Sequence, residues 1–468
     1  MMKVMVIAFF GLACVSLLEL LLWSPWGWRT RKATAPFLAG VLFVFSVWPL
    51  VVLWSVWAAL LLFLSAYRVF NLLRLSKGRM HEAYLRRMTH RTALALISMQ
   101  LGLIVLWELS RWFSITFSDW LMITSVVVLA GVCVFAASTE RHLRTTRLPR
   151  LSHLLTDAEL PTLTVAIPAR NETDDLETCL RSLIASNYPK LEIVVLDDCS
   201  QNRHTPEIIR SFAHDGVRFV QGTEPSDTWL AKNQAYQRLY EEASGELLLF
   251  CGVDTRFEPT SLRAIVTVLL KKKKSMMSIV PQNVWRGRTM SMLLVQPMRY
   301  TWELALPRRL LHRPPVLSTC WITYRSEIEK AGTFAAVSRK IVPESYFVRQ
   351  AIKDDGYTFV QSNDDMALMS HKNIAEQHNT ALRTRYPQLH RKPEIVWLLT
   401  LVELGLVVAP VVNLLVAITE SYAWGWIVVN VISIILLMYY YGKVVAVTYR
   451  KSLWLGYLAL PGALLYDV

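Results

Sequence analysis

Residues 191–198 read LEIVVLDD, a run of aliphatic and β-branched residues that ends abruptly in two aspartates. A run of this kind, too short for a helix and rich in Val and Ile, predicts a buried strand. A similar run ends in polar residues in TLTVAIPARNE (162–172), and another in GELLLFCGVD (245–254). Three such strands predict one sheet whose strand ends share an edge.

Helical patterns separate these strands and continue after them. The expected helices are 174–186, 205–213, 229–243 and 260–270, and the further strands are 217–220 and 276–280. Alternation at this spacing predicts a doubly wound, Rossmann-like parallel sheet, which binds ligands outside the carboxyl ends of its strands. We therefore expect an α/β domain over residues 151–394 with its site at that edge.

Apolar segments long enough to cross a membrane flank this domain, since a crossing needs about 20 residues. They lie at 4–23, 37–66, 92–113, 117–138, 395–418 and 425–441, with a shorter one at 453–466. We expect about four transmembrane helices in 1–150 and two or three in 395–468. The segment 37–66 contains Pro49 and is either one kinked helix or a re-entrant pair.

Charge is concentrated in the first part of the chain. The net charge is +14, and residues 1–150 hold 16 Lys and Arg against 5 Asp and Glu. The basic residues lie mainly between apolar segments, at 68–91 and 141–150. This pattern predicts a multi-pass plasma-membrane protein with a cytoplasmic domain and argues against nucleic-acid binding. Six scattered cysteines exclude a disulfide scaffold and a structural zinc site.

Acidic side chains at three strand ends suit a nucleotide diphosphate and a divalent cation. The clusters are 168–172, Asp197-Asp198 and Val253-Asp254, followed by Arg256. Any one acid alone could instead be a helix cap or turn residue. Lys232 and Arg256 are the cations that could stabilise a leaving diphosphate.

Five motifs together resemble the inverting family 2 glycosyltransferases. They are VAIPARNE (165–172), VLDDCS (195–200), WLAKN (229–233), GELLLFCGVD (245–254) and PESYFVRQAIKDDGY (343–357). The resemblance covers about residues 161–365 and is strongest to membrane enzymes of the hopanoid-associated and carotenoid-glycosylating type. It implies a GT-A fold, a nucleotide-sugar donor (UDP-linked by default), Mg²⁺ or Mn²⁺, and a membrane lipid acceptor.

The resemblance also implies roles for individual residues. Asp254 would bind the metal as the last acid of a DxD motif and so take part in catalysis. Glu344 would be catalytic as the first acid of an acidic pair. The nucleotide-sugar pocket would contain Pro168, Arg170, Glu172, Asp197, Asp198, Lys232 and Val253.

Two positions depart from the family pattern. Gly252 stands where the DxD motif has its first acid, and Ser345 stands where the acidic pair has its expected base. A hydroxyl cannot deprotonate an acceptor at neutral pH without a partner. Glu344, or one of the aspartates at 354, 355, 364 and 365, would have to serve instead. An acceptor that is already an anion, such as polyprenyl phosphate, would need less help.

Several functions remain open on this reading. Leu382 replaces the Gln of the QxxRW motif that marks processive synthases, which favours transfer of a single sugar over a processive polysaccharide synthase. A catalytically degenerate scaffold that still binds nucleotide is the main alternative, and a transporter is the weakest. Residues 284–312 mix Trp, Met and Arg and predict an interfacial segment where a lipid could enter.

Overall fold

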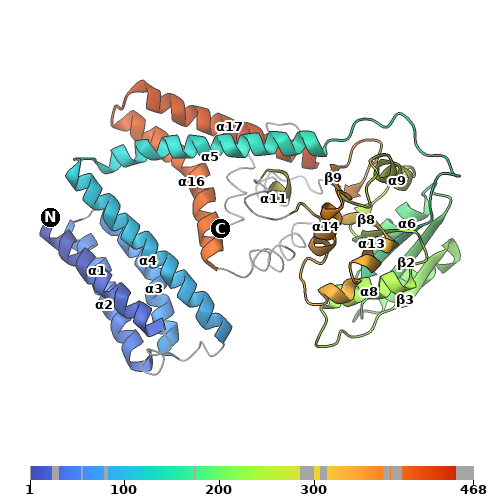
Figure 1. Ribbon diagram of the computed structural model, residues 1–468, viewed down its shortest axis with the longest axis horizontal. Coiled ribbons are helices and arrows are strands. Elements are labelled where there is room, and N and C mark those ends of the chain that lie inside the picture. The colour runs from blue at the N-terminus through green and yellow to red at the C-terminus, as the bar shows by residue number, and fades with distance from the viewer. Residues whose placement is uncertain are drawn as a thin grey trace. The chain divides into compact units, whose positions relative to one another are not determined.

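The computed structural model describes residues 2–23, 31–53, 56–77, 83–172, 174–284, 300–305, 314–372, 380 and 393–449 (Figure 1). The chain divides into two compact units. One contains Met1–Leu129 and Leu389–Val431, and the other contains Ala130–Gln388 and Ile432–Val468. The central sheet belongs to the second unit.

Long helices account for nearly all the described residues of the first unit. They are α1 (Met2–Trp23), α2 (Arg31–Leu53), α3 (Val56–Ser76), α4 (Ala83–Trp112), α5 (Phe117–Thr146), α16 (Pro393–Thr419) and α17 (Trp424–Tyr449), of which α5 and α17 continue into the second unit. Six of them are long and apolar enough to cross a membrane, and α1 has a shorter apolar stretch, Val6–Leu22. The expected segment 37–66 is two helices, α2 and α3, packed on each other. Among the described residues, four of the six candidate spans precede the sheet and two follow it.

The central sheet has the strand order β3-β2-β1-β4-β8-β6-β9. These strands are β1 (Leu163–Ala169), β2 (Leu191–Asp197), β3 (Val217–Gln221), β4 (Leu247–Cys251), β6 (Met276–Val280), β8 (Cys320–Tyr324) and β9 (Tyr357–Gln361). β8 runs antiparallel to both β4 and β6, so the sheet is mixed and the expectation of a parallel sheet was wrong at this strand. A small second sheet joins β5 (Thr255–Arg256), β10 (Met369–Ser370) and β7 (Gln282–Asn283).

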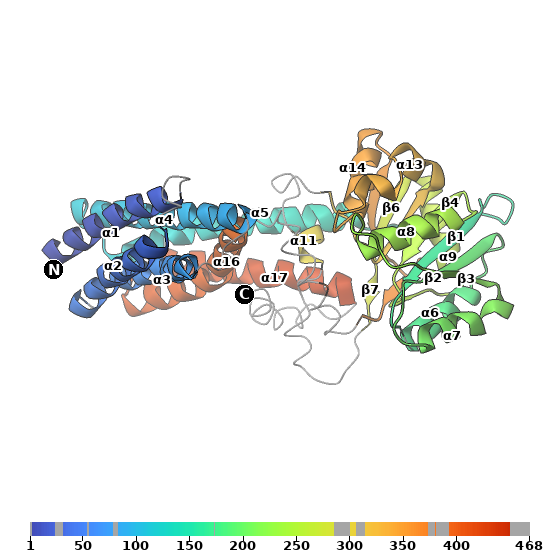
Figure 2. The same ribbon diagram turned by 90° about the horizontal axis from the view of Figure 1, so that it is seen from below.

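Helices cover both faces of the central sheet, as Figure 2 shows. Alternate residues of β1 and β2 point to opposite faces, with Val165 and Val195 on one and Ala166 and Val194 on the other. One face carries α6 (Asp174–Ile184), α7 (His204–Ser211) and α9 (Ser261–Lys271); the other carries α8 (Ala231–Glu242), α13 (Arg325–Lys330) and α14 (Glu344–Lys353). Short helices lie at Ala213–Asp215 (η2), Thr301–Leu304 (α11) and Phe334–Val337 (η4).

Strand direction decides where each helix begins. β1, β2, β3, β4, β6 and β9 all run the same way, because β8 is antiparallel to both its neighbours. Helices that lead into such strands run in the opposite direction. The N-termini of α8 and α14 therefore lie at the carboxyl edge of the sheet, beside the ends of β1, β2 and β4.

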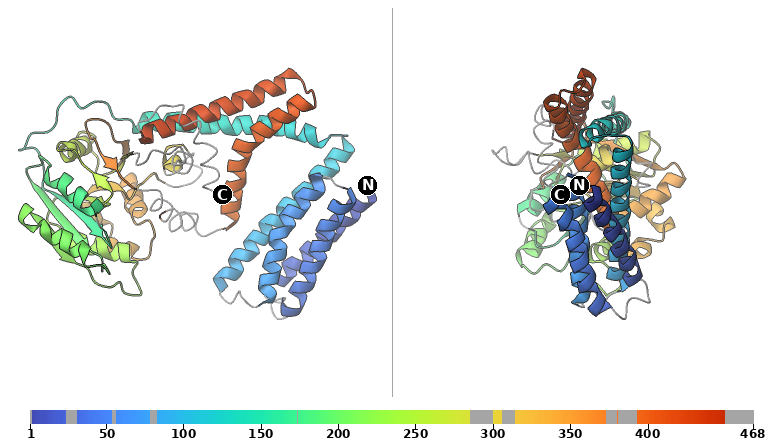
Figure 3. Two further views of the ribbon diagram at one scale, coloured as in Figure 1. Left: turned by 180° about the vertical axis from the view of Figure 1, so that it is seen from behind. Right: turned by 90° about the vertical axis from the view of Figure 1, so that its left-hand side faces the viewer.

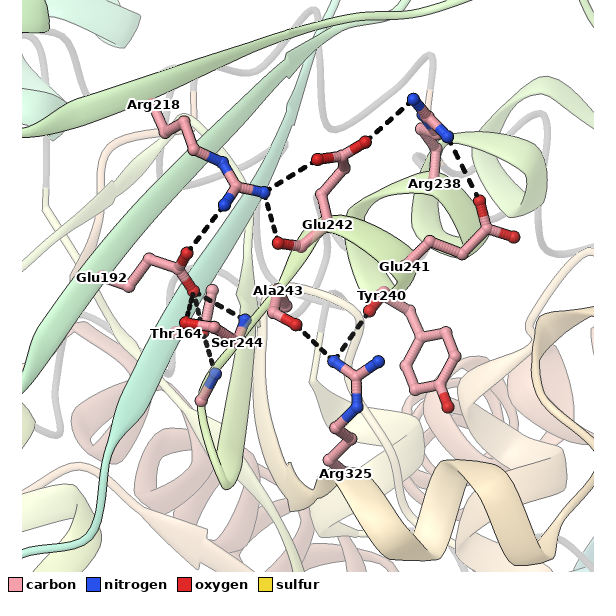
Figure 4. A network of polar contacts seen from close by, with 11 residues as sticks. Thr164, Glu192, Arg218, Arg238, Tyr240, Glu241, Glu242, Ala243, Ser244 and Arg325 are labelled. Atoms are coloured by element: carbon pink, nitrogen blue, oxygen red, sulfur yellow. Dashed lines mark hydrogen bonds and ion pairs between the residues drawn. The ribbon is translucent and has the colours of Figure 1, made fainter.

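The opposite, amino edge carries a network of charged residues, drawn in Figure 4. Arg218 at the start of β3 donates to Glu192 of β2 at 3.1 Å and to Glu242 of α8 at 2.9 Å. Glu192 also accepts hydrogen bonds from Thr164 and from the backbone and hydroxyl of Ser244. The network joins three strands to the end of α8.

Two expectations fall on residues that are not described. In the expected interfacial segment 284–312, residues 285–299 and 306–312 lie outside the described residues, and so does the C-terminal segment 453–466. In the described part of the former, Tyr300, Leu304 and Ala305 are buried. These three residues pack with Phe359 of β9 rather than facing outward.

Candidate active site

The ends of β1 and β2 bring the first two predicted clusters together. Ala169 is paired in register with Asp197, so Arg170 and Asp198 follow side by side. The Arg170 Nη1 atom lies 3.9 Å from Asp198 Oδ2, and the Arg170 side chain is 42% exposed. The arrangement leaves a guanidinium that can move toward a bound anion.

The two adjacent aspartates have different environments. Asp197 is 3% exposed; its Oδ1 accepts from the Ser200 backbone at 3.1 Å and its Oδ2 from Gln221 at 3.4 Å. Its carbonyl accepts from Gly222 N at 2.9 Å, and a Cβ on Gly222 would meet that same carbonyl oxygen at 2.4 Å. Asp197 thus stabilises the turn after β2, whereas the Asp198 carboxylate remains available to a ligand.

The pKa of Asp198 is raised above its ordinary value of 3.8. Burial is the largest cause, and the negative charges of Asp197 and Glu224 add to it, while Arg170 acts in the opposite direction. A ligand that donates hydrogen bonds to a partly buried carboxylate beside other acids stabilises its negative charge. A nucleoside base or ribose hydroxyl is a ligand of this kind.

Asp254 lies in a tight turn after β4. Its Oδ2 accepts a hydrogen bond from the Ser370 hydroxyl at 2.6 Å, and its carbonyl accepts from His371 N at 2.8 Å. A Cβ on Gly252 would meet Asp254 Oδ1 at 2.6 Å, so the family's first acid would have to displace this carboxylate. Sequence reasoning did not find Ser370, the last residue of β10, or His371, which follows it, because both are more than a hundred residues away.

Arg256 supports this turn instead of facing a diphosphate, which corrects the expectation for it. Its side chain is 5% exposed; Nη1 donates to Val253 O at 2.6 Å and Nη2 to Asp175 Oδ1 at 2.7 Å. Val253 is partly buried and packs against the core beneath the sheet. The guanidinium therefore holds the turn against the start of α6.

Lys232 and Glu344 form an ion pair across two helix starts. Lys232 Nζ lies 2.6 Å from Glu344 Oε1, and the two side chains are 39% and 0% exposed. The ammonium also lies 5.1 Å from the centre of the Tyr236 ring. Glu344 is the first residue of α14, where the helix dipole favours a negative charge. The pair presents a half-exposed cation at the carboxyl edge.

Asn233, the residue after Lys232 in the WLAKN motif, has a structural role. Asn233 is buried, and its amide nitrogen lies 2.7–2.9 Å from three carbonyls of the segment before α14, those of Val337, Ser338 and Lys340. Leu230 N also donates to Ser338 O at 2.9 Å. The motif therefore ties the start of α8 to the segment that delivers Glu344.

Of the residues considered as a catalytic base, four either contact other groups or lie away from the carboxyl edge. Ser345 Oγ donates to Val342 O at 2.8 Å, so its proton is already engaged. Asp354 and Asp355 follow the far end of α14, and Asp355 pairs with Lys274 at 2.8 Å. Asp365 accepts from Leu151 N at 2.7 Å.

Pro168 and Glu172 lie on either side of Arg170. Pro168 belongs to β1, is half-buried and is paired in register with Leu196. The carbonyl of Glu172 accepts a hydrogen bond from Thr205 Oγ1 at 2.8 Å. Both residues therefore lie at or just beyond the carboxyl end of β1.

The part of the chain that carries this edge is similar to known proteins. Residues 164–332 match the model of Glycosyl transferase family 2. The probable glycosyltransferase YdaM of Bacillus subtilis is 30% identical over 121 residues, which are 25% of this chain and 28% of that protein. The 4,4'-diaponeurosporenoate glycosyltransferase of Staphylococcus aureus is 25% identical over 167 residues, 35% of this chain and 41% of that protein. The chain thus spans less than half the length of these relatives.

Among solved structures, a mannosyltransferase from Pyrobaculum calidifontis, in complex with GDP-Man and Mn²⁺, is 17% identical with a TM-score of 0.46. The alignment covers 74% of this chain and 96% of that one. The family match falls on the sheet and on the clusters at its carboxyl edge. Residues 164–332 are therefore similar to Glycosyl transferase family 2, and the predicted α/β fold, a central sheet with helices on both faces, is confirmed.

Proposed function

We propose that this protein is a membrane-embedded glycosyltransferase that moves one sugar from a nucleotide sugar to a membrane lipid, with inversion at the anomeric carbon. The observation that carries this proposal is the carboxyl edge of the sheet. There Asp198 and Arg170 are poised for a nucleoside, Asp254 for a metal-bound diphosphate, and Lys232 for the leaving group's charge. A UDP-linked sugar is the default donor.

A divalent cation fits the residues around Asp254 if the substrate supplies most of its ligands. The described part of the chain contains no group of three or more His, Cys, Asp and Glu residues that could hold a metal. Mg²⁺ commonly binds one or two carboxylates and takes its remaining ligands from phosphate oxygens and water. Asp254 would hold Mg²⁺ or Mn²⁺ with the diphosphate, and the metal would neutralise charge on the leaving group.

The Lys232–Glu344 pair bears on the acceptor. Glu344 Oε1 already accepts a hydrogen bond from Lys232 Nζ at 2.6 Å, and the Glu344 side chain is buried. Glu344 is therefore engaged in an ion pair, and Ser345 stands where the family has its expected base. An acceptor that is already an anion needs no strong base, which favours a lipid phosphate such as polyprenyl phosphate over a lipid alcohol.

The helix order supports a cytoplasmic catalytic domain. If each of the seven long helices crosses the membrane, the basic segments 29–32, 74–91 and 141–150 all fall on one side. The connections 54–55, 113–116 and 420–423 fall on the other side and contain no Lys or Arg. The positive-inside rule then assigns the basic side, and the catalytic domain with it, to the cytoplasm of the cell membrane.

The first test follows label from a panel of nucleotide sugars into the lipid extract of membranes containing the protein, with Mg²⁺ or Mn²⁺. We expect metal-dependent transfer by the wild type and its loss, by at least about a thousandfold, in Asp254→Asn. Asp157→Asn is the matched control, because Asp157 is a 70% exposed surface carboxylate. Chain length of the labelled product separates single transfer from a processive synthase.

Two outcomes would overturn parts of the proposal. Nucleotide binding without transfer from any donor would favour the catalytically degenerate scaffold. Efficient transfer to a lipid alcohol, with none to polyprenyl phosphate, would refute the anionic acceptor while leaving the glycosyltransferase intact. A carotenoid carboxylate is a further anionic acceptor to include, given the similarity to the diaponeurosporenoate enzyme.

A further inference from the structure

The last turns of α5 pack one face against the catalytic domain. His142 and Thr146 are buried on this face. The His142 Nδ1 atom lies 3.2 Å from Leu304 O, and Gln361 Nε2 donates to Thr146 Oγ1 at 2.6 Å. The end of this membrane-length helix is thus joined to the end of β9.

The other face of the same turns is basic. Arg141 and Arg144 of α5 and Arg147, which directly follows the helix, are spaced three residues apart and are exposed. Arg144 Nε lies 2.6 Å from Glu140 Oε1, and Lys443 of α17 lies 2.5 Å from Glu140 Oε2. Within the described ranges these four cations have one acidic partner among them. We call Arg141, Arg144, Arg147 and Lys443 the basic patch.

Two tyrosines indicate the depth of this patch. Lys443 Nζ lies 5.0 and 5.2 Å from the ring centres of Tyr439 and Tyr440. Tyr and Trp gather at membrane–water interfaces, and α17 begins at Trp424. The rise from Trp424 to Lys443 is about 28 Å at 1.5 Å per residue, close to the roughly 30 Å thickness of a bilayer's hydrocarbon core. Because Lys443 pairs with Glu140, the first arginine after Glu140 on α5 lies at a similar depth relative to the membrane.

We propose that the basic patch binds the phosphate headgroups of anionic phospholipids in the leaflet next to the catalytic domain. Guanidinium groups bind phosphate with paired hydrogen bonds, and each cation near an anionic surface adds to the attraction. Because the inner face of the same helix turns packs on the catalytic domain, the bound lipid would hold that domain at the membrane surface. This inference does not depend on the proposed sugar transfer.

The test uses the purified full chain in neutral detergent, equilibrated with phosphatidylglycerol or phosphatidylcholine, with retained lipid counted by native mass spectrometry. We expect the wild type to retain phosphatidylglycerol over phosphatidylcholine by about tenfold or more, and less so at high salt. Replacing Arg141, Arg144 and Arg147 with Gln together should remove this preference. Replacing all three with Lys should keep most of it, because the charge remains.

Arg181→Gln is the matched control. Arg181 is 66% exposed and pairs with Glu177 four residues away at 2.7 Å, as Arg144 does with Glu140, but it lies on α6. The inference is overturned if the triple Gln variant keeps the wild-type preference, or if Arg181→Gln loses as much. If the triple Gln variant does not fold, Arg147→Gln alone should still weaken phosphatidylglycerol retention, by about fivefold, and an unchanged value would refute the inference.

Discussion

At the amino edge of the central sheet Glu192 accepts four hydrogen bonds, whereas at the carboxyl edge Asp198 has one guanidinium at 3.9 Å. The two carboxylates differ accordingly in pKa. Burial alone would raise the pKa of Glu192, but hydrogen bonds from Thr164 and Ser244 and the charge of Arg218 outweigh it, so the pKa is lowered. For Asp198 burial prevails and the pKa is raised.

Helix α8 joins the two edges and has a different role at each. Its end carries Glu242, which completes the amino-edge network (Figure 4). Its start carries Lys232, whose partner Glu344 has a buried Oε2 without a hydrogen-bond partner among the described residues. Satisfied charges stabilise a fold, whereas charges left partly unsatisfied are available to a ligand. The comparison predicts stability effects at one edge and functional effects at the other.

The largest contrast should come from removing one cation at each edge. Lys232→Met should lower the transfer rate per folded molecule by about a hundredfold or more, because the leaving diphosphate loses a preorganised cation. Arg218→Met, its counterpart at the amino edge, should leave that rate within about twofold. Both rates are measured with the labelled donor, normalised to folded protein from size-exclusion chromatography. Equal losses in the two variants would contradict the division between the edges.

The second-largest effect should come from lowering the pH, which should weaken nucleotide binding at the carboxyl edge and lower stability at the amino edge over different pH ranges. Asp198, with a raised pKa, takes up its proton first as pH falls, so nucleotide binding should weaken at a pH above the ordinary aspartate value of 3.8. Protonating Asp198 does not cost stability, since its ionised form is disfavoured in the fold. Glu192, with a lowered pKa, loses its contribution to stability progressively as the pH falls from the ordinary glutamate value of 4.5 through that lowered value. Nucleotide titrations should therefore show a pH step in binding that is separate from the loss of stability, and Asp198→Asn should abolish this step.

Two glycines allow a finer comparison at the two edges. A Cβ on Gly222 would lie 2.4 Å from Asp197 O, and a Cβ on Gly245 would lie 2.6 Å from Thr164 N. Both contacts are with backbone, so each Ala variant should lose about 1–3 kcal/mol of stability. Only Gly222→Ala should also weaken nucleotide binding in the folded fraction, because it displaces the turn that carries Asp198. Equally weakened nucleotide binding in Gly245→Ala would contradict the division between the two edges.

The sequence predicted local elements well and distant pairings poorly. The expected strand 276–280 matches β6, and the other predicted strands and helices differ by a few residues, since β-branched runs and polar breaks are local signals. Neither β8 nor β9 was predicted as a strand, and the antiparallel direction of β8 depends on the chain's path and not on the composition of Cys320–Tyr324. The segment 37–66 was predicted as either one kinked helix or a re-entrant pair, since its apolar composition is continuous, and the structure has two helices there, α2 and α3.

The candidate site shows the same limit. The strand-end acids were identified from sequence, because their position follows from the strands themselves. The Lys232–Glu344 and Asp254–Ser370 contacts were not, because their partners are more than a hundred residues apart and lie on different elements. For the same reason Arg256 was predicted as a cation for the diphosphate, because no residue near it in sequence indicates its ion pair with Asp175.

The smallest expected effect is at the amino edge and tests its purely structural role. Glu192→Gln keeps the shape of the side chain but removes the charge that Arg218 pairs with and one hydrogen-bond acceptor. The loss should be about 1 kcal/mol, because Arg218 is 42% exposed and water screens the pair. Thermal unfolding at neutral pH measures this loss, and the gap to wild type should close as the pH falls and Glu192 becomes protonated in the wild type. A gap that stays constant at low pH would mean that the charge of Glu192 does not stabilise this edge.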